Sequence, residues 1–102
     1  MKIIRNRFIP FKGFTAINLF GVLFARHEAY ISETVLNHEK IHTAQMKELG
    51  YILFYIIYLL EWFIRLFLPG NAYRNISFER EAYDHQHYRF YLECREKFAQ
   101  WR

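Results

Sequence analysis

Two histidines and a glutamate lie close together near the middle of this 102-residue chain. His38, Glu39 and His42 form the pattern H-E-x-x-H, in which the histidines are four residues apart. On a helix, residues at this spacing project from nearly the same face, about one turn apart. Two such imidazoles can bind one zinc ion, and a carboxylate beside the first histidine can deprotonate a zinc-bound water. The motif therefore predicts a Zn²⁺ site with His38 and His42 as ligands and Glu39 as the general base.

The motif is short, and the alternative is a helix whose histidines are ordinary polar residues at the edge of a core. A catalytic zinc site also needs a third protein ligand. The segment 77–85, SFEREAYDH, offers several carboxylates just after a predicted helix start. A carboxylate in the first turns of a helix antiparallel to the motif helix could reach the metal, and the apolar segment between them is long enough to bring the chain back.

Two stretches of the chain resemble a known family. The wording N-H-E-K-I-H-T-A-Q at 37–45, followed by E-R-E-A at 79–82, is similar to the gluzincin branch of zinc metallopeptidases, and especially to the minimal gluzincins, or mini-zincins, known from uncharacterised bacterial proteins. The resemblance extends from the N-terminal strands to the last helix. It implies a peptide-bond hydrolase whose third zinc ligand is Glu79, with Glu81 as the second choice.

The chain departs from that family at one position. Tyr83 stands where those families carry an aspartate that supports a ligand histidine. Such outer hydrogen bonds normally fix the orientation of a metal-binding imidazole. Asn37, Glu28 and Tyr83 itself are the candidate substitutes.

Further polar residues have two interpretations each. His85, His87, Tyr73 and Tyr83 could stabilise an oxyanion during peptide hydrolysis, or could be surface or core-edge residues. Spacing alone places none of them at the metal. Gln45, one turn beyond His42, could pack in the core or could support a ligand histidine by a hydrogen bond, and packing is the favoured interpretation.

The elements that must position these residues begin with two extended runs, 2–8 and 15–26, separated by Pro10 and Gly13. They predict a β-hairpin, and Gly21 is expected to mark a bulge. A helix is expected to begin at Ser32, which can cap free N–H groups, and to end near Gly50. Its stripe of residues at spacings of three and four includes both motif histidines.

Two more helices are expected. Residues 51–68 form the most apolar segment, within which Glu61 and Arg65 are predicted to make an exposed contact four residues apart. Pro69-Gly70-Asn71 predicts a turn, and Ser77 is expected to cap a last helix from Phe78 onward. Its aromatic and sulfur-containing residues recur at helical spacing and are expected to face the core: Phe90, Tyr91, Cys94, Phe98 and Trp101.

Composition restricts the class of protein. Hydrophobic residues make up 53% of the chain and aromatic residues 21%, so residues 1–102 are expected to form one domain with a single core. The lone cysteine, Cys94, cannot form an intramolecular disulfide, which suits a reducing compartment, and is interpreted as a small buried residue. The basic N-terminus lacks the apolar run of a secretory signal. The net charge of +4 is scattered, and no nucleic-acid-binding motif accompanies it.

Together these observations predict an α+β fold, with a small N-terminal β-hairpin packed on about three helices. The function predicted is zinc-dependent hydrolysis of peptide bonds in a peptide or protein substrate, in the cytoplasm. Two alternatives stay open: a non-catalytic zinc-binding protein, and a small membrane-associated helical protein. In residues 51–68 the uninterrupted apolar part is only ten residues long, which favours a core helix over a membrane span, while a helix at a membrane surface is a further option. A homo-oligomer or a partner protein would be a way to complete a cleft on so small a scaffold.

Overall fold

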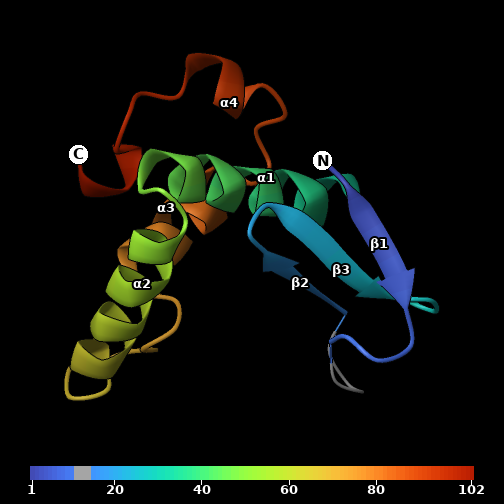
Figure 1. The fold of residues 1–102 in the computed structure, drawn as a ribbon. Helices are drawn as coiled ribbons and strands as arrows, with labels where there is room; N and C mark the ends of the chain where they lie inside the picture. The colour runs from blue at the N-terminus through green and yellow to red at the C-terminus, as the bar shows by residue number, and fades with distance from the viewer. Residues whose placement is uncertain (11–14) are drawn as a thin grey trace.

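The N-terminal part of the chain forms a three-stranded sheet. The computed structural model describes residues 1–10 and 15–102, and Figure 1 shows the sheet at one end of the molecule. The strands are β1 (Ile3–Asn6), β2 (Ala16–Leu19) and β3 (Val22–Arg26), in the spatial order β1-β3-β2. β2 is antiparallel to β3, whereas β1 is parallel to β3.

The predicted hairpin between runs 2–8 and 15–26 was wrong in its pairing. The second run folds back on itself, because Phe20 and Gly21 both adopt positive φ (53° and 87°) and form the two-residue turn between β2 and β3. Gly21 is therefore a turn residue and not a bulge. β1 then pairs with the remaining edge of β3, and Gly13 lies outside the described residues.

The motif helix begins and ends as its sequence predicts. α1 spans Glu33–Glu48, and the Ser32 hydroxyl oxygen accepts a hydrogen bond from the Val35 N–H at 3.1 Å. Gly50 follows with φ +67°, a conformation that glycine adopts at low cost after a helix end. α1 therefore presents the motif histidines from a helix fixed at both ends.

The apolar segment forms α2 (Ile52–Arg65), which projects away from α1 in Figure 1. No helix among the described residues is long and apolar enough to cross a bilayer. The expected contact between Glu61 and Arg65 is not formed. Instead, the Glu61 carboxylate accepts hydrogen bonds from the Ser77 N–H at 3.1 Å and from the Ser77 hydroxyl at 2.6 Å. Ser77 is thus the first residue of the next helix, and Glu61 supplies the cap.

The last predicted helix is broken into three pieces. They are α3 (Ser77–His85), α4 (Tyr91–Cys94) and a 3₁₀ turn, η1 (Ala99–Trp101). The Asn37 side-chain N–H₂ donates to the main-chain oxygens of Gln86 and Tyr88, at 2.8 and 3.0 Å, so α1 satisfies the carbonyls where α3 ends. The prediction that this segment faces the core was correct for Tyr91 and wrong for four other residues, which are exposed: Phe90, Cys94, Phe98 and Trp101.

The core lies between the helices in two groups of buried side chains. One comprises Met46, Phe54, Ile76 and Phe78, where α1, α2 and the start of α3 meet. The other comprises Ile41, Ala82 and Tyr91, where α1, α3 and α4 meet. Both groups hold α1 against α3, the pair of helices that carries the candidate site.

Candidate metal centre

Three side chains from two helices converge between α1 and α3. The Glu79 Oε1 atom lies 3.1 Å from His38 Nε2 and 3.0 Å from His42 Nε2, and the two Nε2 atoms are 3.1 Å apart. All three residues are buried, at 4–6% exposed. Ligands about 2.0–2.1 Å from a tetrahedral zinc ion would stand roughly 3.3 Å apart, so the observed triangle is only slightly tighter than a zinc site.

The other nitrogen of each imidazole is held by a glutamine. His42 Nδ1 lies 2.8 Å from Gln45 Oε1, and His38 Nδ1 lies 2.8 Å from Gln86 Oε1. The Gln45 amide is oriented unambiguously, because its nitrogen donates to the Phe78 carbonyl and to the Glu81 carboxylate. Each Nδ1 therefore donates its proton to a glutamine oxygen, and in a neutral ring each Nε2 carries a lone pair.

Three electron-pair donors thus face one another at buried positions between α1 and α3. Such an arrangement is repulsive unless a proton or a metal cation lies between the donors. Burial acts to lower the pKa of His42, but its hydrogen bond with Glu79 and the negative charge there raise that pKa to about 9. Burial alone would raise the pKa of Glu79, yet its hydrogen bonds with both histidines hold that pKa well below the ordinary range.

The second oxygen of Glu79 is also held in place. Tyr58, from α2, donates its hydroxyl proton to Glu79 Oε2 at 2.8 Å. Burial of the phenol, together with the nearby Glu79 charge, raises the pKa of Tyr58, so the hydroxyl stays a donor. Helices α1, α2 and α3 therefore all contribute to the orientation of His38, His42 and Glu79, which we call the donor set.

Glu39 lies beside this triangle without belonging to it. Its side chain is half-buried and lines a cavity of about 370 Å³ that His42, Glu79, Tyr58 and residues 16–19 of β2 also line. Burial raises the pKa of the Glu39 carboxyl, more than the neighbouring histidines lower it. A carboxylate with a raised pKa is better suited to take up a proton near neutral pH.

Glu81, the second choice for the third ligand, points elsewhere. Its carboxylate accepts hydrogen bonds from Arg95 at 2.5 and 3.1 Å, from Tyr91 at 2.7 Å and from Gln45 at 2.9 Å. Among the described residues, the one group of potential ligands whose atoms lie within 4.8 Å of one another is His38, His42 and Glu79. The geometry thus favours Glu79 over Glu81.

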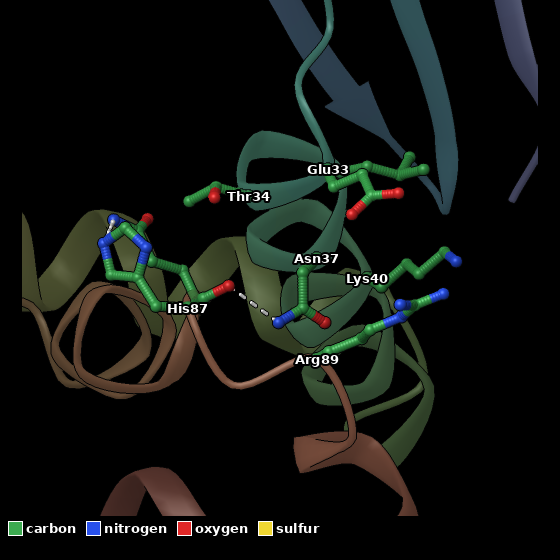
Figure 2. A pocket seen from close by; sticks show the side chains of 8 residues that line it. Glu33, Thr34, Asn37, Lys40, His87 and Arg89 are labelled. Atoms are coloured by element: carbon green, nitrogen blue, oxygen red, sulfur yellow. Dashed lines mark hydrogen bonds between the residues drawn. The ribbon is translucent and has the colours of Figure 1, made fainter.

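Several other predicted candidates lie away from this group. The His85 ring stacks on Tyr91 at 4.0 Å, and His87 lines a separate cavity of about 250 Å³ with Asn37 and Lys40 (Figure 2). The Asn37 side chain is hydrogen-bonded to the main chain at the end of α3, as the dashed line in Figure 2 indicates. Glu28 pairs with Arg26 at 2.6 Å. Asn37 and Glu28 therefore do not support a motif histidine.

The two tyrosines considered for an oxyanion separate in space. Tyr73 lines the same cavity as Glu39, whereas Tyr83 places its ring edge-on to His38, with ring centroids 4.6 Å apart. The Tyr83 hydroxyl donates to the Tyr73 oxygen at 3.4 Å, which leaves the Tyr73 proton available for another acceptor. Burial and this hydrogen bond raise the pKa of Tyr73.

Sequence reasoning missed two residues that orient the site, Gln86 and Tyr58, and favoured packing over ligand support for Gln45. The spacing of three between His42 and Gln45 on one helix already allows their contact. Gln86 follows Glu79 by seven residues, two turns along the helix direction, so this spacing was also readable. Tyr58 lies in a segment where every neighbour is apolar, and no local pattern distinguishes its hydroxyl.

Comparisons with protein-family models, curated proteins and solved structures find no match to this chain.

Proposed function

We propose that the protein is a zinc-dependent metallopeptidase of the gluzincin type, with His38, His42 and Glu79 as the metal ligands. The observation that carries the proposal is the triangle of buried donors, 3.0–3.1 Å apart, whose remaining atoms are all held by other side chains. Two imidazoles and one carboxylate are a donor set that zinc favours at hydrolytic sites. The set leaves a fourth position for water on the side of the cavity.

Zinc at this position would lower the pKa of a coordinated water and polarise a peptide carbonyl. The residues of the chain supply the remaining chemistry. Glu39 takes the proton of the attacking water and delivers it to the departing amine, in keeping with its raised pKa. Tyr73 donates its hydroxyl proton toward the carbonyl oxygen as negative charge develops there.

A peptide substrate is supported by the outer edge of β2, which no other strand of residues 1–10 and 15–102 pairs with. Thr15 accepts a hydrogen bond from the Arg26 N–H across the sheet, and the antiparallel ladder alternates, so the main-chain groups of Ala16 and Asn18 face away from β3. These two residues line the cavity with Glu39. The Asn18 main-chain oxygen already accepts a hydrogen bond from the Tyr55 hydroxyl at 3.3 Å, so an extended peptide would pair with the main-chain groups of Ala16, its own main chain alongside the donor set.

Asn18 ties that edge to the motif helix. Its side-chain N–H₂ donates to the Glu39 main-chain oxygen at 3.0 Å and to the Thr43 hydroxyl at 3.1 Å, while its own Oδ1 accepts from the Gly21 N–H at 3.0 Å. The strand and the proposed general base are therefore held in a fixed relation. Such positioning is what peptide hydrolysis requires of a site that must align water and carbonyl.

A second candidate function has one observation in its favour. The donor set joins α1 to α3, so a metal ion there would also cross-link two helices of a small core, as structural zinc sites do. In a protein with only this role, zinc would stabilise the fold and Glu39 would be dispensable.

One set of variants distinguishes the candidates. We expect about one zinc per wild-type chain purified without added metal or a histidine tag, and loss of that zinc in His42→Ala and Glu79→Ala. Glu39→Gln should keep its zinc but lose at least about a hundredfold of the cleavage rate on a mixture of unstructured peptides. Zinc binding without cleavage by wild type would favour the structural role, and absence of bound zinc would refute both.

A further inference from the structure

The solvent-facing side of α2 and of the turn after it is almost entirely apolar. Between Ile52 and Leu68, eleven large apolar side chains are each 42–76% exposed, among them Leu53, Ile56, Leu60, Phe63 and Phe67. We call these exposed side chains the α2 face. Together they offer on the order of 1,000 Å² of apolar surface, whereas the largest patch on a typical monomer is about 300–600 Å². An exposed surface of this size marks an interaction site.

The α2 face carries no charge. Within residues 52–68, all of which the structure describes, the charged residues are Glu61 and Arg65, and both are half-buried. The Glu61 carboxylate is turned toward Ser77. A surface that contacts another protein usually has a polar rim around an apolar centre, and that rim is missing along this segment.

The width of the α2 face is equally informative. At 100° per residue, the exposed positions of α2 cover an arc of roughly 200°, and Phe54, Tyr58, Glu61 and Arg65 occupy the opposite side. A helix that packs on one neighbour needs an apolar stripe of about 100°. A second copy of the chain would therefore leave the flanks of the α2 face in water, whereas lipid chains would cover the whole arc.

We propose that α2 docks into one face of a lipid bilayer, with the α2 face among the acyl chains. The helix has 14 residues and is about 21 Å long at 1.5 Å per residue, shorter than the roughly 30 Å hydrocarbon core, so it enters from one side without crossing. Trp62 lies on the α2 face, and its amphipathic indole suits the boundary between headgroups and chains. Figure 1 shows α2 at the side of the molecule opposite the sheet, which leaves the approach open.

Docking has a consequence for the cavity beside Glu39. Leu59 belongs to the α2 face, 63% exposed, and also lines that cavity. The cavity therefore meets the membrane surface at Leu59. If peptide hydrolysis is the function, its substrates are protein segments that lie at the bilayer surface; this consequence rests on the proposed function, whereas the docking does not.

Vesicle flotation of the full chain tests the docking. We expect wild type to float with phosphatidylcholine vesicles and with vesicles that also contain phosphatidylglycerol, and to remain bound at high salt because the contact is apolar. The double variant Ile56→Glu/Phe63→Glu should bind at least about tenfold less, since buried charge in the acyl region is costly. Phe8→Glu/Tyr30→Glu is the matched control, because these side chains are 73% and 84% exposed in connecting segments far from α2 in the sequence. Far-UV circular dichroism checks that all variants are folded.

A second measurement keeps the proposal falsifiable. In Trp101→Phe, Trp62 is the only tryptophan, and brominated acyl chains should quench its fluorescence. Lack of quenching, or equal loss of flotation in both double variants, would overturn the proposal. So would a dimer, detected by sedimentation without vesicles, that Ile56→Glu/Phe63→Glu dissociates while wild type fails to float; the α2 face would then join two copies. Failure of peptide cleavage, with flotation intact, would refute only the proposed function.

Discussion

His38, His42 and Glu79, which form the donor triangle, each make a further hydrogen bond on the side that faces away from the triangle. Gln86 fixes His38, Gln45 fixes His42, and Tyr58 fixes the far oxygen of Glu79. Rotation of any one ring would break a buried hydrogen bond, which costs about 1–3 kcal/mol. The three donor atoms are therefore kept at close range, and a proton and a metal ion must compete for the space between them.

That competition predicts how zinc affinity depends on pH. The pKa of His42 is raised to about 9, so at neutral pH its ring holds a proton that a metal ligand must lose. We expect the apparent zinc affinity to rise about tenfold per pH unit from pH 6.5 to 8.5, with about one proton released by His42. Calorimetric titration in buffers of different ionisation enthalpy measures both quantities.

The raised pKa of His42 stabilises the metal-free protein, whereas it weakens zinc binding. A raised histidine pKa contributes stability that is fully present below the unfolded value, about 6.5, and is lost as pH rises through about 9. Metal-free protein should therefore unfold more readily at pH 9 than at pH 6.5 in urea, while the stabilisation by zinc grows. A zinc affinity that does not change with pH would show that His42 is neutral in the metal-free protein.

A second prediction concerns the hydroxyl behind Glu79. Tyr58→Phe removes one hydrogen bond to Oε2 and leaves the ring packed against Phe54 and Phe78. Loss of such an outer contact typically lowers metal affinity 10- to 100-fold, and we expect about tenfold here. Competition with a fluorescent zinc chelator measures it. Tyr30→Phe, whose residue is 84% exposed, is the control and should leave the affinity unchanged.

At the scale of elements, each helix that bears the site depends on a cap of different origin. Ser32 caps α1 from its own sequence, whereas Glu61 caps α3 from the neighbouring helix α2. Glu79 is the third residue of α3, so the position of this proposed ligand depends on how the first turn of α3 is held. The link between α2 and the donor set thus runs through Glu61 as well as Tyr58.

The cap predicts a loss of stability in Glu61→Ala. The Ser77 N–H and hydroxyl would lose their acceptor, and we expect unfolding by urea to be easier by about 1 kcal/mol, the usual cost of a lost helix cap. Zinc affinity should fall as well, because the first turn of α3 would fray. Arg65→Ala, one turn along α2, should change stability by less than about 0.5 kcal/mol. Equal effects of the two substitutions would mean that the cap does not matter.

Prediction from the sequence succeeded where the stabilising contact is local, and it failed where the contact comes from a distant part of the chain. α1 was predictable at both ends because Ser32 and Gly50 act within a few residues of the helix they bound. The last helix was not, since it ends where Asn37, 48 or more residues earlier, takes up its carbonyl oxygens. Likewise, the parallel pairing of β1 depends on which edge of β3 stays free after the tighter turn at Gly21 has closed.

The site shows the same division between local and distant causes. The spacing of His38 and His42 on one helix follows from four residues of sequence, and their approach to each other needs no other element. The residues around Glu79 and Glu81 do not by themselves indicate which of the two is the third proposed ligand, because both sit at the start of α3. It depends on Arg95, which contacts Glu81 from the far end of the chain.

At the scale of the whole molecule, Arg95 joins the C-terminal segment to the site. Its guanidinium pairs with Glu81 on α3 and with Glu48 on α1, and its side chain is only 6% exposed. Glu81 in turn accepts from Gln45, the residue that holds His42. Burial alone would raise the pKa of Glu81, but Arg95, Gln45 and Tyr91 lower it, so this contact contributes stability above pH 4.5 that is lost as pH falls.

Arg95→Met should therefore act on both stability and metal binding. Removing one partner leaves the carboxylate of Glu81 buried with less compensation, which typically costs 3–5 kcal/mol, and we expect about 3 kcal/mol at pH 7. Because Gln45 would be drawn toward the unpaired Glu81, zinc affinity should also fall. Arg102→Met is the control, since its pair with Glu96 is largely exposed and contributes little. The double variant Arg95→Met/Glu81→Gln removes the uncompensated charge and should recover part of the stability; if it is no more stable than Arg95→Met, the contribution of Arg95 comes from packing and not from charge.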